Sequence, residues 1–180
     1  MRFVPYVIIG FLLVQDAFAE SSIIESSVSN TYIYTDHYEV LINRPAEEVW
    51  PHLLDLGSWM YDFEMALEDG EPQAEGALYR LYSGEDFFYL IVKIIPGRMI
   101  VGVNLPSNME GEESVGIAMF TLAEVGGKTL VTNFMSRQYD WPVEEPSPIK
   151  QRRESEDFKA FNSDMWGRFL GRLKEVTERE

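Results

Sequence analysis

Turn-forming residue pairs divide the middle of the chain at short intervals, and this spacing constrains the fold more than any other feature. The pairs are Asp69-Gly70, Glu75-Gly76, Ser83-Gly84, Pro96-Gly97 and Gly126-Gly127, with a longer polar stretch over 106–113. The segments between them are rich in β-branched and aromatic residues and alternate in polarity, which is typical of hairpin-linked strands. We predict an antiparallel meander with strands at about 65–69, 77–82, 86–95, 98–105, 114–124 and 128–139.

The charged residues of two neighbouring predicted strands indicate which of their faces meets water. Lys93 and Arg98 are expected on the solvent side. Because side chains alternate between the faces of a strand, the opposite residues are expected to face inward. These are Phe88, Leu90, Val92, Met99, Val101 and Val103.

A strand and two short helices are predicted before the meander. From Thr31 to Ile42 the chain is rich in Tyr, Val, Ile and Thr, which predicts a first strand. Proline and acidic residues at the next positions predict a short helix from Pro45 or Ala46 to about Leu54, kinked at Pro51. A second short helical piece is expected from about Ser58 to Phe63.

The end of the chain has helical periodicity. Ser155 is a candidate N-cap, and apolar residues then recur every three or four positions. They are Phe158, Phe161, Met165, Phe169, Leu173 and Val176, with Trp166 and Leu170 widening the stripe. We predict a long amphipathic C-terminal helix, which a proline-rich loop at Trp141–Pro148 separates from the meander.

The first residues have the three regions of a secretory signal peptide. Arg2 is followed by an apolar run from Phe3 to Val14 and by the small-residue site Ala17-Phe18-Ala19. The run is shorter than the roughly 20 residues that a membrane-spanning helix needs, so cleavage after Ala19 is expected, with no stable anchor afterwards. Residues 20–29 are serine-rich and are expected to form a flexible leader to a single domain at 30–180.

Composition narrows the partners and the compartment. A hydrophobic fraction of 46% suffices for one core, and a net charge of −15 disfavours nucleic acid and anionic lipid as partners. The chain has no cysteine, so no disulfide or thiolate metal site can form. With the signal peptide, these features favour a bacterial periplasmic or secreted protein that has no cofactor or metal.

One stretch resembles a known superfamily. Residues 38–50 read Tyr-Glu-Val-Leu-Ile-Asn-Arg-Pro-Ala-Glu-Glu-Val-Trp, and Leu53, Asp55 and Trp59 follow. This pattern, with the order of the predicted elements, is similar to the START/SRPBCC superfamily, and to its polyketide cyclase/dehydrase and lipid-transport branch in particular. The resemblance implies an α+β helix-grip fold, in which a curved antiparallel sheet of about seven strands wraps a long C-terminal helix.

The resemblance also implies a ligand cavity between the sheet and the long helix. The expected lining residues are Trp59, Phe63, Tyr79, Arg80, Phe88, Leu90, Val101, Phe158, Phe161, Met165 and Phe169. For the aromatic residues the alternative is an ordinary core, because helical periodicity shows burial alone. For Arg80 two interpretations stay open: an arginine on the exposed sheet face, or one that binds a ligand carboxylate inside.

Other chemistry has little support in the sequence, and no catalytic residue is assigned. His37 and His52 have no metal-ligand spacing, and no Gly-x-Ser-x-Gly motif is present. The stretch Gly126-Gly127-Lys128-Thr129 resembles part of a phosphate-binding loop, but the segment after it reads as a strand, so a hairpin turn is predicted.

Three functions follow from this reading. The first is an exported carrier of a small hydrophobic ligand such as a lipid, an isoprenoid or a polyketide-like molecule. The second is a cyclase, dehydratase or hydrolase on the same scaffold, which requires a carboxylate or histidine with a perturbed pKa inside. The third is an interaction module whose interior is filled by its own side chains.

Overall fold

The computed structural model describes residues 20–25, 31–82, 86–105, 114–140, 151 and 154–179. The strands are Glu20–Glu25 (β1), Thr31–Ile42 (β2), Glu64–Asp69 (β3), Leu78–Tyr82 (β4), Asp86–Ile95 (β5), Met99–Leu105 (β6), Ser114–Val125 (β7) and Lys128–Asp140 (β8). The helices are Ala46–Leu54 (α1), Leu56–Trp59 (α2) and Glu156–Arg179 (α4). The predicted signal peptide and the loop at 141–148 lie outside these ranges.

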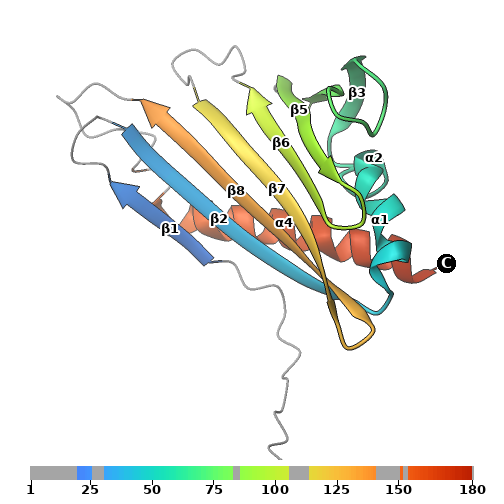
Figure 1. Ribbon diagram of the computed structural model, residues 1–180. Helices are drawn as coiled ribbons and strands as arrows, with labels where there is room; N and C mark the ends of the chain where they lie inside the picture. Colours follow the sequence, from blue (N-terminus) through green and yellow to red (C-terminus); the bar gives the residue numbers. More distant parts are fainter. Residues whose placement is uncertain are drawn as a thin grey trace, which may run out of the picture.

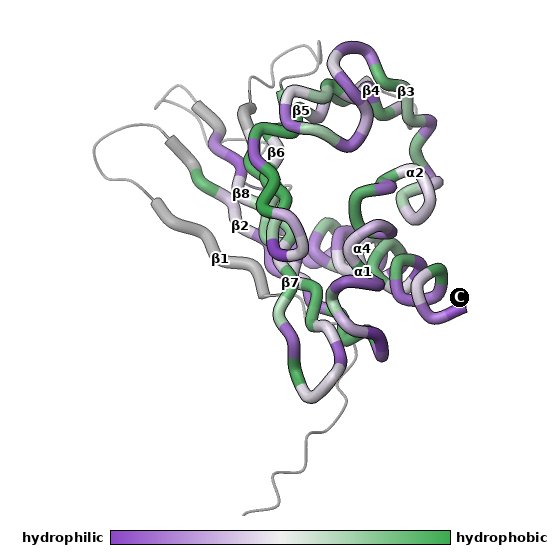
Figure 2. Tube along the Cα trace, turned by 45° about the vertical axis from the view of Figure 1, so that its right-hand side comes forward, coloured by the Kyte–Doolittle hydropathy of each residue, from purple (hydrophilic) through white to green (hydrophobic). Residues whose placement is uncertain are grey.

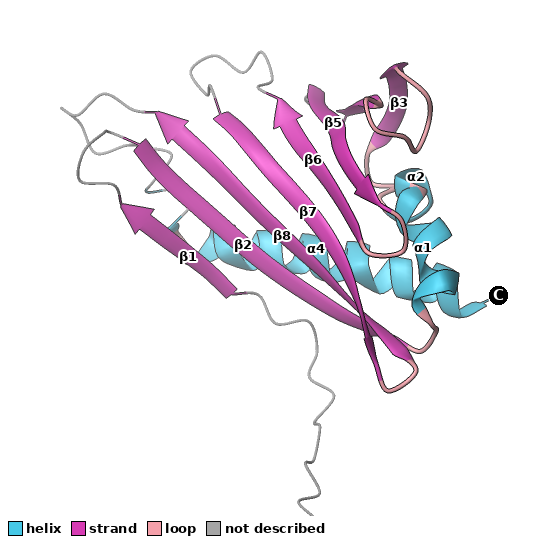
Figure 3. Cartoon of the chain, viewed as in Figure 1, coloured by secondary structure: helices cyan, strands magenta, loops and turns pink. Residues whose placement is uncertain are grey.

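The strands form one antiparallel sheet in the order β1-β2-β8-β7-β6-β5-β4-β3. The sheet is curved, and α1, α2 and α4 lie on one side of it (Figures 1 and 3). The seven predicted strands are all present, and the helix-grip α+β architecture is confirmed.

The turn between β7 and β8 shows how local chemistry sets the register of this sheet. Gly126 and Gly127 both have positive φ, 60° and 76°, and join the paired residues Val125 and Lys128. Two consecutive positive φ values define the type of turn that fits the twist of a two-residue hairpin. The predicted hairpin is therefore confirmed in place of a phosphate-binding loop.

Helix α4 packs against the concave face of the sheet. Its buried residues are Asn162, Trp166, Phe169, Leu170, Leu173 and Thr177. The predicted cap is present, since the Phe158 backbone N–H donates to the Ser155 hydroxyl at 3.3 Å. At the other end, the Asn43 backbone N–H donates to a Glu178 carboxylate oxygen at 2.7 Å. Both ends of the helix are thus fixed by hydrogen bonds.

The short helices differ slightly from the prediction. Helix α1 contains Pro51 and ends at Leu54, as predicted. Helix α2 spans Leu56–Trp59 and so begins earlier than the expected Ser58–Phe63. The Met60 N–H closes this turn on the Leu56 carbonyl at 2.9 Å, and the chain then has to reverse before β3 starts.

The predicted inward faces of β5 and β6 are wrong. The ladder shifts register between Ile91 and Lys93, so an extra residue separates the two halves of β5. A shift of one residue moves every following side chain to the other face. Phe88 and Leu90 therefore share the outer face with Lys93, and Tyr89 and Ile91 point inward and are buried.

The same correction applies to β6. Val101 pairs with Lys93 and lies outside, whereas Ile100 and Gly102 face the interior. Met99 and Val103 lie on the outer face with Val101, by alternation. Val92 is 40% exposed.

The expected flexible leader at 20–29 also needs correction over its first six residues. Residues 20–25 form β1, which pairs with β2 from Glu20↔His37 to Glu25↔Tyr32. A long strand at the edge of a sheet leaves a row of backbone groups to be paired, and this pairing needs no particular side chains. The sheet thus gains an eighth strand.

Candidate ligand-binding site

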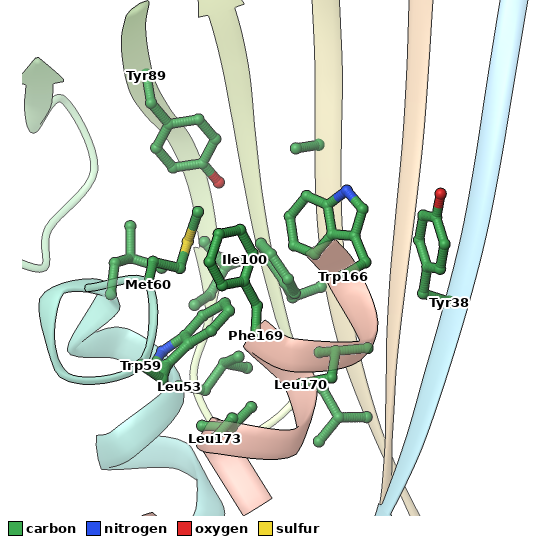
Figure 4. Close-up of a cluster of buried hydrophobic side chains, with 14 of the residues drawn as sticks. Tyr38, Leu53, Trp59, Met60, Tyr89, Ile100, Trp166, Phe169, Leu170 and Leu173 are labelled. Carbon is green, nitrogen blue, oxygen red and sulfur yellow. The ribbon is translucent and has the colours of Figure 1, made fainter. Parts of the chain in front are cut away.

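The interior between the sheet and α4 is filled with aromatic side chains at one end. Near α2, Trp59 contacts Phe120 edge-on, with ring centroids 5.6 Å apart. Phe169 of α4 contacts both Phe63 and Trp166 at 5.6 Å. Figure 4 shows the rings of Trp59, Phe169 and Trp166 above Leu53 and Leu173. This end is an ordinary core.

The other end of the concave face carries polar residues. Strand β2 contributes Asp36, and β8 contributes Asn133 and Arg137; the register places all three on the side that faces α4. Asn104 of β6 joins them, because it pairs with Gly116, which pairs with Arg137. Figure 2 shows hydrophilic and hydrophobic residues mixed along β6 and β8.

Two glycines allow large polar side chains to lie flat on this face. A Cβ atom at Gly102 would lie only 2.3 Å from the hydroxyl oxygen of Tyr89, so the ring of Tyr89 crosses β6 at that point. A Cβ atom at Gly116 would lie 2.9 Å from Cγ of Arg137, which crosses β7. The two side chains therefore approach the middle of the sheet from opposite sides, and Ala118 lies between them.

Four side chains on this face or packed over it have buried polar atoms without a hydrogen-bond partner among the described residues, as does the indole N–H of Trp59 at the other end. We call them the interior polar cluster: Tyr89, Asn133, Arg137 and Trp166. The atoms are the Tyr89 hydroxyl, both amide atoms of Asn133, Nε of Arg137 and the indole N–H of Trp166. Trp166 covers Asn133, since its ring contacts Tyr38 and Phe120, which are the two cross-strand partners of Asn133.

The burial of the cluster makes these atoms costly. Asn133 is 0% exposed, Trp166 is 5% exposed and Tyr89 is 6% exposed. A buried polar group without a partner costs about 1–3 kcal/mol. Asn162 shows the usual solution, because its amide donates to Oδ2 of buried Asp36 at 3.3 Å. The cluster therefore leaves hydrogen-bonding groups unused in the interior.

Burial also fixes the protonation state of Tyr89. Desolvation raises the pKa of Tyr89 above its usual range, because the phenolate form would be charged in a dry environment. The hydroxyl is therefore neutral and able to donate a hydrogen bond. In Figure 4 it points from β5 toward Phe169 and Trp166.

Several residues predicted to line the cavity do lie in the interior. Trp59, Tyr79 and Phe169 are buried, and Phe63 and Met165 pack partly buried against the same cluster. The hydroxyl of Tyr79 has a structural role, since it accepts the Gln73 N–H at 2.8 Å. Phe158 contacts the ring of Tyr34 edge-on at 6.4 Å.

Other predicted residues lie elsewhere. Arg80 is on the outer face, where its Nε pairs with Oε1 of Glu68 at 2.8 Å. Of its two interpretations, the arginine on the exposed sheet face is therefore the correct one. Phe88, Leu90 and Val101 are on the same outer face. Phe161 is 59% exposed.

Sequence reasoning missed all four cluster residues as candidates. Tyr89 was missed because its neighbours Phe88 and Leu90 were predicted to face inward. Trp166 belongs to the apolar stripe of α4, but nothing in that stripe marks its indole N–H. Asn133 and Arg137 belong to β8, where Leu130 and Phe134 face outward. The usual contrast between an apolar inner face and a polar outer face is absent from this strand, so its sequence gives no signal.

A separate hollow of about 430 Å³ lies on the outer side of α4. It is lined by Tyr61, Asp164, Gly167, Arg168, Gly171, Arg172 and Glu175. Arg172 pairs with Asp62 at 3.0 Å and stacks on the ring of Tyr61 at 3.4 Å. Each charged group that lines this hollow has an ion-pair partner: Arg168 pairs with Asp164, Arg172 with Asp62 and Glu175 with Arg179. The unpartnered polar groups of the interior are therefore the stronger candidate for a ligand site.

Two further features of the described residues concern metal ligands and membrane-spanning helices. No group of three histidine, aspartate or glutamate side chains within them could hold a metal ion. His37 lies on the outer face of β2, 3.2 Å from Glu39, and His52 belongs to α1. Among the helices with a described structure, none is both long and apolar enough to cross a membrane.

Comparison with known proteins identifies the fold. No family model and no curated protein matches the chain. MLL2253 from Mesorhizobium loti matches with a TM-score of 0.58 at 16% identity, over 81% of this chain and 97% of that one. The Bet v 1-like protein Ara h 8.0201 matches with a TM-score of 0.57 at 11% sequence identity, over 82% of this chain and 99% of that one. DynU16, a polyketide cyclase-like protein of the dynemicin biosynthetic locus, matches with a TM-score of 0.50 at 19% sequence identity. The match covers 79% of this chain and 46% of that one.

These likenesses and the element order agree. The chain has the helix-grip fold, which its sequence resemblance to the START/SRPBCC superfamily predicted.

Proposed function

We propose that this protein binds a small, largely apolar molecule between the sheet and α4, with a polar group of the ligand held by the interior polar cluster. The observation that carries the proposal is the set of buried, unpartnered polar atoms on Tyr89, Asn133, Arg137 and Trp166. Ligand sites are mostly apolar and contain a few placed polar groups, and this interior has that composition.

The energetics favour a ligand of this kind. Burial of apolar surface contributes about 25 cal/mol per Å², before the costs of association are subtracted. A ligand that also satisfies the cluster removes penalties of about 1–3 kcal/mol for each group. An entirely apolar ligand would leave those penalties in place.

The neighbours in structure support a binding role. Bet v 1-like and polyketide cyclase-like proteins share the fold, and we extend to this chain the use of the interior for a ligand. Binding is favoured over catalysis because the buried carboxylate of Asp36 is engaged by Asn162. Neither histidine belongs to the interior polar cluster, since His37 lies outside and His52 is on α1.

We further propose that the protein is exported and carries its ligand in the periplasm or outside the cell. The support is the signal-peptide pattern that ends at Ala19 and the absence of cysteine. A net charge of −15 would keep such a carrier soluble.

Uptake of a neutral apolar dye tests the binding role. We expect saturable, one-to-one binding of N-phenyl-1-naphthylamine, measured by fluorescence. Ala118→Leu fills the concave face beside the cluster and should weaken binding at least tenfold. Ala123→Leu is the matched control, because Ala123 lies on the same strand and is exposed.

Circular dichroism must first show that both variants fold. Absence of saturable dye uptake by the unaltered protein would contradict the proposal. Equal loss of binding in the two variants would contradict the position of the site.

A further inference from the structure

We infer that the ligand carries a carboxylate, which binds to Arg137. The inference rests on the proposed function and makes it more specific. Its structural basis is a partly buried arginine on the concave face whose charge has no acidic partner among the residues that the structure describes.

Arg137 differs from the arginines that form an ion pair within the described part of the chain. Those arginines, each with its acidic partner, are Arg44 with Glu48, Arg80 with Glu68, Arg168 with Asp164, Arg172 with Asp62 and Arg179 with Glu175. Arg137 instead lies over Gly116, and its Nε is buried without a hydrogen-bond partner. A buried cationic group requires an anion or several acceptors to offset its desolvation.

The balance of donors and acceptors in the cluster also points to an anion. The unpartnered atoms comprise three groups that only donate, on Arg137, Trp166 and the Asn133 amide nitrogen, and one that only accepts, the Asn133 amide oxygen. The Tyr89 hydroxyl can donate or accept, so donors outnumber acceptors when it donates. An ionised carboxylate accepts only and has about four lone-pair positions. Its hydrogen bonds to arginine are charge-assisted and stronger than those between neutral groups.

Asp36 is the nearby carboxylate on the same face, and the structure assigns it to a different partner. It pairs in register with Met135, one inward-facing position before Arg137 on β8. Its Oδ2 accepts a hydrogen bond from Asn162, on α4. The guanidinium of Arg137 is therefore left for the ligand.

The rest of the ligand has to be apolar. The neighbours of the cluster are Ala118 and Phe120 on β7, Met135 on β8, and Met165 and Phe169 on α4. These side chains offer contact area and no charge. The class of ligand is thus a carboxylic acid with an aliphatic or aromatic body.

Paired acids and methyl esters test the inference. Displacement of N-phenyl-1-naphthylamine is measured with dodecanoic acid and methyl dodecanoate, and with 2-naphthoic acid and its methyl ester. In at least one pair the acid should bind ten times more tightly than its ester. Arg137→Met should abolish this preference, because the acid then loses its charge-assisted hydrogen bonds.

Arg80, on the outer face of the sheet, provides the control for the substitution of Arg137. Arg80→Met makes the same change on the outer face and should keep the preference for acids. Three results would each overturn the inference that the ligand carries a carboxylate bound to Arg137. They are equal affinities for acid and ester, displacement of the dye by no acid of the set, and a preference for acids that survives in Arg137→Met. Those results leave dye binding intact, whereas failure to bind the dye would overturn the proposed function itself.

Discussion

Asn133 and Asn162 are both buried asparagines, but they differ in their hydrogen bonds. Asn162 donates to Asp36, whereas both amide atoms of Asn133 lack a partner within the described part of the chain. A residue that serves only the fold is normally satisfied within the fold. The difference between the two asparagines is what the proposed function predicts, since Asn162 serves the fold and Asn133 would serve a ligand.

Replacement by leucine should distinguish them. Asn133→Leu should raise the free energy of unfolding of the ligand-free protein by about 1–2 kcal/mol, because it removes an unsatisfied amide. Asn162→Leu should lower it by about 2–3 kcal/mol, because the carboxylate of Asp36 loses a donor. Urea denaturation measures both changes. Equal destabilisation by the two substitutions would show that Asn133 is structural.

The burial of Tyr89 predicts how the stability of the protein changes at alkaline pH. Its pKa is raised in the folded protein by burial, so its contribution to stability is complete below the pKa of an unfolded tyrosine, about 10. The contribution is lost as pH rises above that value, because unfolding then releases a proton. Between pH 9 and 11 the stability of the unaltered protein should fall more steeply than that of Tyr89→Phe. Parallel curves from urea denaturation would contradict the burial of the hydroxyl.

Individual residues also show how much of a site the sequence alone can predict. The burial of Trp59, Tyr79 and Phe169 was predictable because it follows from pattern and element order. The choice between Arg80 and Arg137 was not, since each lies in a strand with polar and apolar residues on both faces. The registers of β4 and β8 decide which arginine points inward.

At the scale of elements, α4 contains two glycines, Gly167 and Gly171, and glycine lowers the stability of a helix. A Cβ atom at Gly167 or Gly171 would meet no atom within 4 Å, so neither glycine permits a close approach. Both lie beside the outer hollow, away from the interior polar cluster.

Alanine at position 171 should therefore stabilise the protein. Glycine in a helix interior costs about 0.8–1 kcal/mol relative to alanine, and Gly171→Ala should gain that amount. Gly102→Ala is the opposite case, because its Cβ would overlap the ring of Tyr89. Thermal denaturation compares the two variants. A loss of stability in Gly171→Ala would show that the glycine has a packing role.

The existence and type of the elements were predictable, but two details were not. The register shift between Ile91 and Lys93 has no turn residue to mark it, and it reversed the predicted inner face of β5. Strand β1 forms from a serine-rich segment because the edge of β2 supplies its backbone partners. Both details depend on neighbouring strands and not on local sequence.

At the scale of the whole molecule, the predicted cleavage site lies immediately before β1. Glu20 is the first residue of that strand and the expected first residue of the mature protein. Intact-mass measurement of protein recovered from the periplasm or medium of an exporting host should show a chain of residues 20–180. A chain that retains residues 1–19 would contradict export by cleavage after Ala19.

The central claim is that the interior holds an apolar ligand by means of the polar cluster. Native mass spectrometry of the protein purified from an exporting host without detergent, followed by solvent extraction of the bound material, tests this claim most directly. We expect a one-to-one adduct whose extract contains an apolar molecule with an acidic group. A mass equal to that of the polypeptide alone, from protein that also takes up no neutral dye, would contradict the claim and favour a filled-core interaction module.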